Sequence, residues 1–564
     1  MSGPLPGRLA LALSGLALAS DSVARAAPGD PPAEAIDAVF ARHAGAGVPG
    51  CALGVFRDGA ILYERGYGLA DLEQNAPITP DTVFYIASTS KQFTAFAAAL
   101  LIERGALSPD DPIRRHLPEL PAWADGITVD QLIHHTSGIS DYLSLWDASG
   151  RSYADEIPLS QAIDLIARQR SRSFAPGSAW AYSNSNYVLL AEIVARVSGK
   201  GSLRAFADEA MFAPLGMTAT EFRDDAAHVV PRRAEGYAPD GRGGFTVARS
   251  SFALVGDGGL LTTVRDLLKW DENFYANRLA GGQALIDRVT APGALADGTP
   301  LTQPPYAFGL QTGSHRDLPT VEHAGGFIGF SAQLVRFPTR HLSVAVLCND
   351  AAAPAGALAL GVADLYLGAA PAAAADAAAP PPVPAPATVA QDVLARWTGR
   401  YFITPPGIVV TIAAAGDGLG LRTYGGSSPL TTVSGETFAM PEVPGLLRFS
   451  AGLDGRPSLL IEGIGQAAPA PRLPDPPGED ALRGFAGRYA SDELDTWFAI
   501  RAAEGGLELK RRYRAAWEKL EAIDQDRFAL AGGTLRFSRD AQGRVSGFAI
   551  SGGRIADVSF EKTE

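Results

Sequence analysis

The stretch that decides the fold is residues 88–101, STSKQFTAFAAALL. Apolar side chains recur at helical spacing in its second part, at Phe93, Phe96, Ala97, Leu100 and Leu101. This spacing places them on one face of a helix that packs against a core. Ser88 stands just before the run and so falls at the helix N-terminus, where free N–H groups and the positive end of the helix dipole stabilise negative charge.

Lys91 is the second chemical group in this stretch. It follows Ser88 by nearly one helical turn, so its amine comes within reach of the serine hydroxyl. A partly desolvated amine loses its proton more readily and can act as the base for a serine nucleophile. Alone, however, S-x-x-K is typical of a capped surface helix with a solvated lysine, so the hypothesis needs partners elsewhere in the chain.

Two such partners follow in order. Residues 181–187, AYSNSNY, contain Y-x-N at Tyr182 and Asn184, and residues 322–326, EHAGG, contain H-x-G at His323 and Gly325. With these motifs the chain resembles the serine β-lactamase and penicillin-binding family, in its class C-like branch with D-aminopeptidases, D-alanyl-D-alanine carboxypeptidases and esterases. The resemblance covers nearly all of residues 35–350.

The resemblance implies the roles of three catalytic residues. Ser88 attacks a carbonyl and forms an acyl-enzyme, while Lys91 and the Tyr182 phenol share the proton relay. We expect the neighbouring ammonium to lower the pKa of the Tyr182 phenol toward the working range.

It also implies four substrate-binding positions. The backbone N–H groups of Ser88 and Gly326, next to Gly325, form the oxyanion hole. Asn184 donates its amide to a substrate carbonyl or holds the lysine. His323 stands where β-lactamases have Lys, so the fixed positive charge for a substrate carboxylate is missing there, which weighs against a β-lactamase.

The flanking segments predict an antiparallel sheet. Residues 51–56, a turn at Asp58-Gly59 and residues 61–63 form one predicted hairpin, and residues 330–337 with 342–347 form another. Strands at both ends with helices between them indicate an α+β domain whose sheet is closed by its two ends. The resemblance makes this a β-lactamase/transpeptidase-like domain over residues 28–367.

Two Pro-rich stretches divide the rest of the chain. Residues 368–390, nearly all Ala and Pro, and residues 468–480 are predicted linkers. Between and after them, residues 391–467 and 481–564 repeat each other: Trp397-Thr-Gly-Arg-Tyr401 is answered by Phe485-Ala-Gly-Arg-Tyr489, and later matches keep the same spacing. Alternating runs punctuated by Gly predict two small antiparallel β-barrels, lipocalin-like in fold class.

Residues 1–27 combine Arg8, a short apolar run and an A-x-A site, which predicts a secretory signal peptide and a secreted or periplasmic protein. We expect a buried free thiol at each of Cys51 and Cys348, on the first and last strands of the sheet, with pairing as the alternative. The net charge of −13 and the lack of a basic run with aromatics exclude nucleic acid as a partner. No other stretch is apolar and long enough for a membrane span.

The predicted function is a serine hydrolase acting on small amides or esters, of the D-aminopeptidase type. The alternatives are a carboxylesterase or D-alanyl-D-alanine carboxypeptidase on the same fold, and a non-catalytic wall-binding protein. We expect a small-molecule or peptide substrate, no cofactor and no metal, with His134 and His135 as packing and turn residues. The basic patch at 510–514 is typical of a solvated strand end, although the resemblance to D-aminopeptidases implies a loop of the last domain at the mouth of the site. The oligomeric state is left open.

Overall fold

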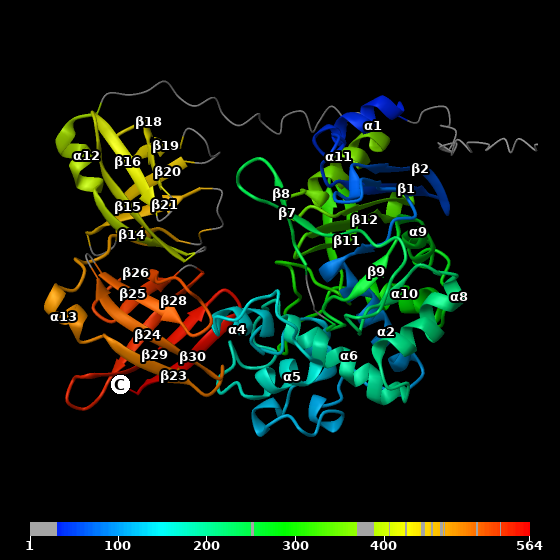
Figure 1. Cartoon of the computed structure of the whole chain (residues 1–564), viewed down its shortest axis with the longest axis horizontal. Helices are drawn as coiled ribbons and strands as arrows, with labels where there is room; N and C mark the ends of the chain where they lie inside the picture. Colours follow the sequence, from blue (N-terminus) through cyan, green and yellow to red (C-terminus); the bar gives the residue numbers. More distant parts are fainter. Residues whose placement is uncertain are drawn as a thin grey trace, which may run out of the picture.

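The computed structural model describes residues 31–249, 253–368 and 389–563, with short gaps in the last range at 405–406, 424–425, 441–445, 453–454, 463–465, 467, 504–505 and 531. The predicted signal peptide at 1–27 and most of the predicted linker at 368–390 lie outside the described residues. Within the described part, no helix has the length and apolarity that a membrane span needs. Figure 1 shows a sheet-and-helix domain beside two β-domains.

A six-stranded antiparallel sheet organises the sheet-and-helix domain, in the order β10-β11-β12-β13-β1-β2. Its strands are β1 (Cys51–Arg57), β2 (Ala60–Tyr67), β10 (Gln311–His315), β11 (Leu318–Phe327), β12 (Phe330–Phe337) and β13 (Leu342–Cys348). The first strand pairs with the last, so the sheet is closed by the two ends of the domain, as predicted. The predicted hairpin turn is also present, because Asp58 and Gly59 both have the positive φ of a tight two-residue turn (51° and 73°).

Helices cover both faces of this sheet, and the alternation of side chains along β1 explains why. Leu53 and Val55 join one buried cluster with α1 (Ala33–Val39) and α11 (Ala355–Leu367). Ala52 and Phe56 point the other way and join a second cluster around α2 (Lys91–Glu103). The strand is therefore apolar along its length because neither face meets water.

The second face carries the helical region that holds the site. Its helices are α3 (Val129–Ile133), α4 (Tyr142–Ala148), α5 (Leu159–Ala167), α6 (Asn184–Ser198), α7 (Leu203–Ala207), α8 (Ala213–Leu215), α9 (Val264–Glu272) and α10 (Gly282–Thr290). Its short strands are β3 (Leu69–Asp71), β4 (Ala76–Pro77), β5 (Phe84–Tyr85), β6 (Glu221–Phe222), β7 (Tyr237–Pro239), β8 (Phe245–Val247) and β9 (Leu260–Thr262). Helix α2 packs on α6 in this layer, so the S-x-x-K and Y-x-N segments meet where their two helices begin.

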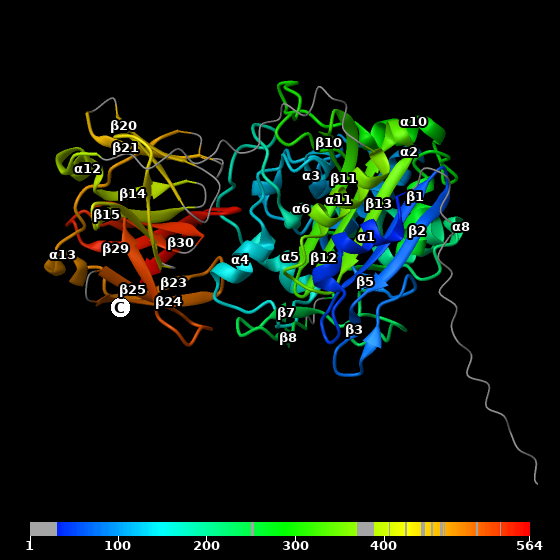
Figure 2. The ribbon, with the colours of Figure 1, turned by 90° about the horizontal axis from the view of Figure 1, so that it is seen from above.

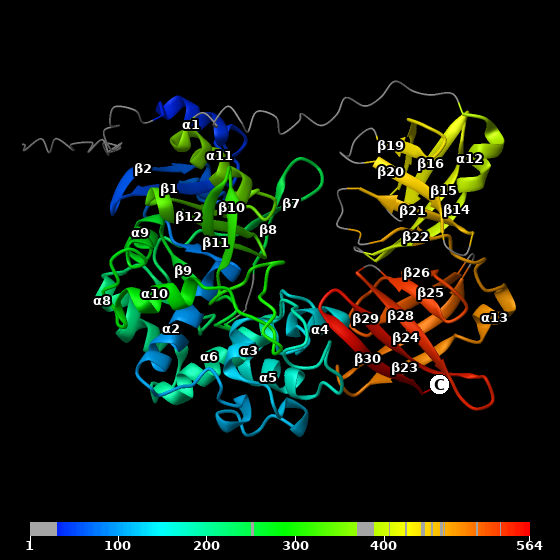
Figure 3. The ribbon, with the colours of Figure 1, turned by 180° about the vertical axis from the view of Figure 1, so that it is seen from behind.

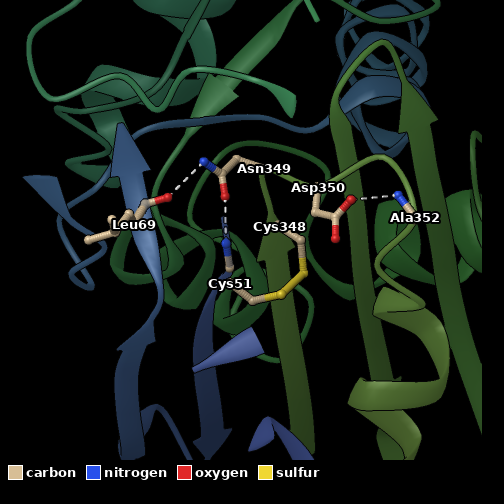
Figure 4. Close-up of a disulfide and its surroundings, with 7 residues drawn as sticks. Cys51, Leu69, Cys348, Asn349, Asp350 and Ala352 are labelled. Atoms are coloured by element: carbon tan, nitrogen blue, oxygen red, sulfur yellow. Dashed lines mark hydrogen bonds between the residues drawn. A yellow bond between two sulfur atoms is a disulfide. The ribbon is translucent and has the colours of Figure 1, made fainter. Parts of the chain in front are cut away.

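The two cysteines form a disulfide, which corrects our expectation of free thiols. Cys51 and Cys348 are direct partners in the β1–β13 ladder, with Cα atoms 4.0 Å apart. Figure 4 shows the bridge beside Asn349, whose side-chain oxygen accepts from Gly50 N at 2.8 Å and whose amide donates to the Leu69 carbonyl at 3.0 Å. The strand register therefore decides the pairing, and residue spacing alone does not disclose it.

The first β-domain has two sheets around one core. After α12 (Gln391–Trp397), the strands are β14 (Gly399–Ile403), β15 (Ile408–Ala415), β16 (Gly418–Thr423), β17 (Gly426–Pro429), β18 (Thr431–Thr432), β19 (Thr437–Ala439), β20 (Leu446–Ala451), β21 (Pro457–Ile461) and β22 (Ala470–Pro471). Strands β14–β17 form one sheet and β18–β22 the other, and both contribute to a single cluster. Strand β22 lies inside the stretch 468–480 that we expected to be a linker, and it pairs with β21.

The second β-domain is a closed antiparallel barrel of β23–β30, which follows α13 (Glu479–Arg483) (Figure 3). Its strands are β23 (Gly487–Ser491), β24 (Thr496–Ala503), β25 (Gly506–Arg511), β26 (Glu518–Ala522), β27 (Arg527–Leu530), β28 (Gly533–Arg539), β29 (Val545–Gly552) and β30 (Ile555–Lys562).

The sequence repeat corresponds to a repeated local structure. Tyr401 donates its hydroxyl to the Trp397 carbonyl at 2.8 Å, and Tyr489 donates to the Phe485 carbonyl at 2.7 Å. Each tyrosine thus ties the first strand of its domain to the aromatic residue shortly before that strand.

Candidate active site

Ser88 lies in a short 3-10 turn, η2 (Ala87–Ser90), which runs directly into α2. Strands hold this turn on two sides: Ile86 N donates to the Leu260 carbonyl at 3.1 Å, and Thr89 Oγ1 donates to the His323 carbonyl at 3.2 Å. Ala87 has a φ of 46°, a region that residues with a Cβ rarely occupy, and such strained backbone gathers at functional sites. The turn therefore presents Ser88 in a fixed position.

Lys91 is completely buried beneath Ser88, and its amine lies within hydrogen-bond distance of three oxygen atoms. Its Nζ lies 2.7 Å from Asn184 Oδ1, 2.6 Å from the Asp257 carbonyl oxygen and 3.2 Å from Ser88 Oγ. The amide and carbonyl oxygens can only accept, so they take two N–H bonds of the lysine. The remaining tetrahedral position of the amine faces the serine hydroxyl, and in the neutral amine this position is a lone pair.

Asn184 is itself oriented by a buried carboxylate. Asp141 Oδ2 accepts from the Asn184 backbone N at 2.6 Å and from its Nδ2 at 2.8 Å. Because the amide nitrogen is engaged there, the amide oxygen must face Lys91. Asp141 Oδ1 accepts from Ser144 N at 2.8 Å, which makes Asp141 the N-cap of α4 as well.

The electrostatic surroundings of Lys91 and Asp257 make the neutral form of the lysine easier to reach. Burial lowers the pKa of Lys91 below its ordinary value, an effect that the charge of Arg554 reinforces and the charges of Asp257 and Asp141 oppose. Burial raises the pKa of the Asp257 carboxyl, against the opposing pull of Lys91. Tyr142 donates its hydroxyl to that carboxyl at 3.0 Å.

The structure corrects the expected pKa of Tyr182. Burial raises the pKa of its phenol above the ordinary value, and this outweighs the opposing hydrogen bond with Ser88 and the charge of Arg554. Lys91 Nζ lies over the Tyr182 ring, 4.9 Å from the centroid. Tyr182 is therefore a proton donor in the resting site, and Lys91 is the group suited to accept a proton.

The edge of β11 forms the opposite wall. Pairing with β10 ends at Gln311↔Glu322, so the next residues of β11 turn that edge toward η2. A Cβ on Gly325 would lie 2.1 Å from the Ile86 carbonyl oxygen and 2.9 Å from Thr89 Oγ1. Gly325 thus permits the close approach of the strand to the serine turn, whereas Gly326 has open space where its Cβ would be.

His323 is a buried neutral imidazole. Its Nδ1 lies 2.6 Å from the Ala324 carbonyl oxygen, which can only accept, so Nδ1 carries the proton and Nε2 accepts from the Tyr306 hydroxyl at 3.2 Å. Burial, aided by the charge of Lys91, lowers the pKa of His323 to about 4. This strand supplies no fixed positive charge at neutral pH.

All seven predicted residues come together. A cavity of about 690 Å³ is lined by Ser88, Tyr182, Asn184, His323, Gly325 and Gly326, and Lys91 lies beneath it.

His135, which we expected to be a packing residue, is completely buried, and its Nδ1 accepts from Ser183 N at 3.3 Å.

Sequence reasoning missed three charged residues of this cavity, namely Asp141, Asp257 and Arg554. Asp141 and Asp257 lie outside the S-x-x-K, Y-x-N and H-x-G motifs, so the spacing of the motifs did not point to them. Arg554 lies in the β29–β30 turn and has no local signal. The described ranges contain no group of three or more His, Cys, Asp or Glu side chains placed to hold a metal ion.

The comparisons with known proteins agree with this architecture. The family model Beta-lactamase matches residues 36–404. A D-aminopeptidase of Cereibacter sphaeroides is 30% identical over 467 residues, which cover 81% of this chain and 82% of that protein. A D-aminopeptidase of Brucella ovis is 28% identical over 538 residues, covering 91% and 96%. Among solved structures, an octameric penicillin-binding protein homologue from Pyrococcus abyssi has the same fold, with a TM-score of 0.55, 24% identity and coverage of 76% of this chain and 96% of that one. The chain therefore belongs to the beta-lactamase family and is a serine hydrolase.

Proposed function

We propose that this protein is a D-aminopeptidase that cleaves small amides or peptides through an acyl-enzyme at Ser88. The observation that carries the chemistry is the position of the Lys91 amine. The Asn184 side-chain oxygen and the Asp257 carbonyl accept two of its N–H bonds, which leaves one position for the Ser88 hydroxyl. The substrate class is supported by the two relatives named D-aminopeptidase, whose similarity extends past the Beta-lactamase match into the β-domains.

The proposed reaction uses each group in turn. Neutral Lys91 accepts the Ser88 proton while Oγ bonds to the substrate carbonyl carbon. The N–H groups of Ser88 and Gly326 bind the resulting oxyanion, a contribution of about 3 kcal/mol for each donor. The Tyr182 hydroxyl, kept protonated by burial, gives its proton to the leaving nitrogen as the C–N bond breaks, and the Lys91 ammonium then gives the phenolate the proton that it took from Ser88, so that both groups return to their resting states. Water then hydrolyses the acyl-serine.

The test compares p-nitroaniline release from D-alanyl-p-nitroanilide with p-nitrophenol release from p-nitrophenyl butyrate, for the wild type and Ser88→Ala. We expect amide cleavage that Ser88→Ala abolishes. Serine-dependent cleavage of the ester alone would assign a carboxylesterase. A long-lived penicillin adduct without amide cleavage would assign a penicillin-binding peptidase. If neither wild-type rate exceeds that of Ser88→Ala and no adduct forms, the result would favour the non-catalytic wall-binding protein over a hydrolase.

We also propose that the protein is exported. The apolar leader supports this, as does the Cys51–Cys348 disulfide, because such bonds persist in oxidising compartments. Fractionation of cells that express the full chain is the test, and a cytoplasmic protein with an intact leader would contradict it.

A further inference from the structure

We propose that Arg554 of the C-terminal barrel binds a carboxylate of the substrate, so that the enzyme prefers substrates bearing a free carboxyl group close to the scissile bond. This inference rests on the proposed function for the reaction that reports it. The H-x-G strand supplies no cation at neutral pH, since His323 is neutral, and a different domain supplies one to the same cavity through Arg554.

Figure 2 shows the C-terminal barrel beside α4, and Arg554 of this barrel lines the cavity. The Arg554 carbonyl accepts from Asp141 N at 2.9 Å, at the residue that caps α4. At the other end of the helix, Arg514 forms an ion pair with Asp147 at 2.9 Å, and Thr496 Oγ1 donates to the Ser149 carbonyl at 2.9 Å. The turn that carries Arg554 is therefore fixed to the same helix cap that orients the site.

The basic patch at 510–514 supports this interface and is not simply a solvated strand end. Arg511 is only 7% exposed, and its guanidinium donates to the Asp147 carbonyl at 2.8 Å. The patch thus docks the barrel, while the residue that reaches the cavity comes from the turn between β29 and β30.

The Arg554 guanidinium itself is open to a ligand. It lies over the Tyr182 ring, 4.6 Å from the centroid, and its side chain is 47% exposed. Its ion pair with Asp141 spans 3.9 Å, beyond hydrogen-bond distance, and both oxygens of that carboxylate are already occupied by Asn184 and Ser144. A guanidinium fork can hold a carboxylate through two parallel hydrogen bonds.

The position of Arg554 limits where the carboxylate lies. Tyr182 is hydrogen-bonded to Ser88 and carries the guanidinium on its ring face. The cation is thus within about 10 Å of the nucleophile, a span of about three extended residues. Two sources fit: the carboxyl end of a short leaving peptide, or the side chain of an acidic acyl residue.

The experiment uses two matched pairs of substrates. D-Alanyl-glycine and D-alanyl-glycinamide differ in a leaving-group carboxylate, while the p-nitroanilides of D-glutamate and D-glutamine differ in a side-chain carboxylate. We expect kcat/KM to favour the acid over its amide by about tenfold or more in one pair. Arg554→Met should remove that preference and Arg554→Lys should keep part of it. Arg544→Met, at an exposed turn of the same barrel, is the matched control that should retain it.

A binding measurement separates failure of this inference from failure of the proposed function. Calorimetry on Ser88→Ala and on Ser88→Ala/Arg554→Met measures the affinity for the same four compounds without turnover. If nothing is cleaved but the acids bind only when Arg554 is present, the carboxylate site stands and the D-aminopeptidase proposal fails. If cleavage depends on Ser88 but acid and amide remain equal in both pairs, with or without Arg554, the carboxylate site is refuted.

Discussion

Replacing Gly325 by Ala tests how closely β11 must approach the serine turn. The new Cβ would lie 2.1 Å from the Ile86 carbonyl oxygen, whereas an ordinary contact needs 3.4 Å or more. The strand and the turn must therefore separate by more than 1 Å, which moves the Gly326 N–H away from the oxyanion. A misplacement of about 1 Å typically reduces turnover about 100-fold, and we expect a loss of that size in kcat/KM.

The assay is hydrolysis of D-alanyl-p-nitroanilide, with thermal unfolding measured on the same preparations. Gly356→Ala on α11 is the control for a Gly-to-Ala change, because its nearest neighbour would be Gln333 Oε1 at 3.7 Å. We expect that control to keep wild-type turnover. A Gly325→Ala enzyme with turnover within threefold of wild type and an unchanged Tm would refute the reasoning.

Three further predictions concern protons, the core and the interface. Because burial lowers the pKa of Lys91 and the neutral amine is the base, kcat/KM should rise with pH through a group that titrates below free lysine. His323 should add no limb near neutral pH, since burial lowers its pKa to about 4. A limb that disappears in a His323→Gln variant would contradict this. Arg336 and Asp271 form an ion pair at 2.7 Å, and their side chains are only 1% and 3% exposed. Asp271→Asn should lower the free energy of unfolding in urea by about 3–5 kcal/mol, because it leaves the buried charge of Arg336 without a counter-charge. An unchanged midpoint would show the pair to be unimportant for stability. Asp147→Ala removes the Arg514 ion pair at the barrel interface, so it should weaken the preference for acid over amide substrates. Ser88-dependent cleavage of the amide should persist. An unaltered preference would show that the remaining interface contacts are enough to position Arg554.

Much of the fold was predictable because its signals are local. The Asp58-Gly59 turn, the alternation in the outer hairpins and the helical spacing after Ser88 each depend on neighbouring residues, and each is present. The order of the three motifs identified the seven residues that surround the cavity.

What could not be predicted depends on contacts between distant segments. The rise in the pKa of Tyr182 comes from the depth of its burial, which spacing does not disclose. The Cys51–Cys348 bond depends on strand register, and the approach of Arg554 depends on how a separate domain docks. In each case the local sequence is compatible with either outcome, and tertiary packing selects one.

The pairing of β1 with β13 also constrains the order in which the chain can fold. The two cysteines are 297 positions apart, so β1 has no partner on that side until nearly the whole domain has been synthesised. Contacts at such long range are slow to form, and an unpaired apolar strand is prone to aggregate while it waits. Once the bond has formed, a protease cut in any loop between the two strands leaves both fragments covalently joined, so a clipped molecule would separate into two bands only after reduction.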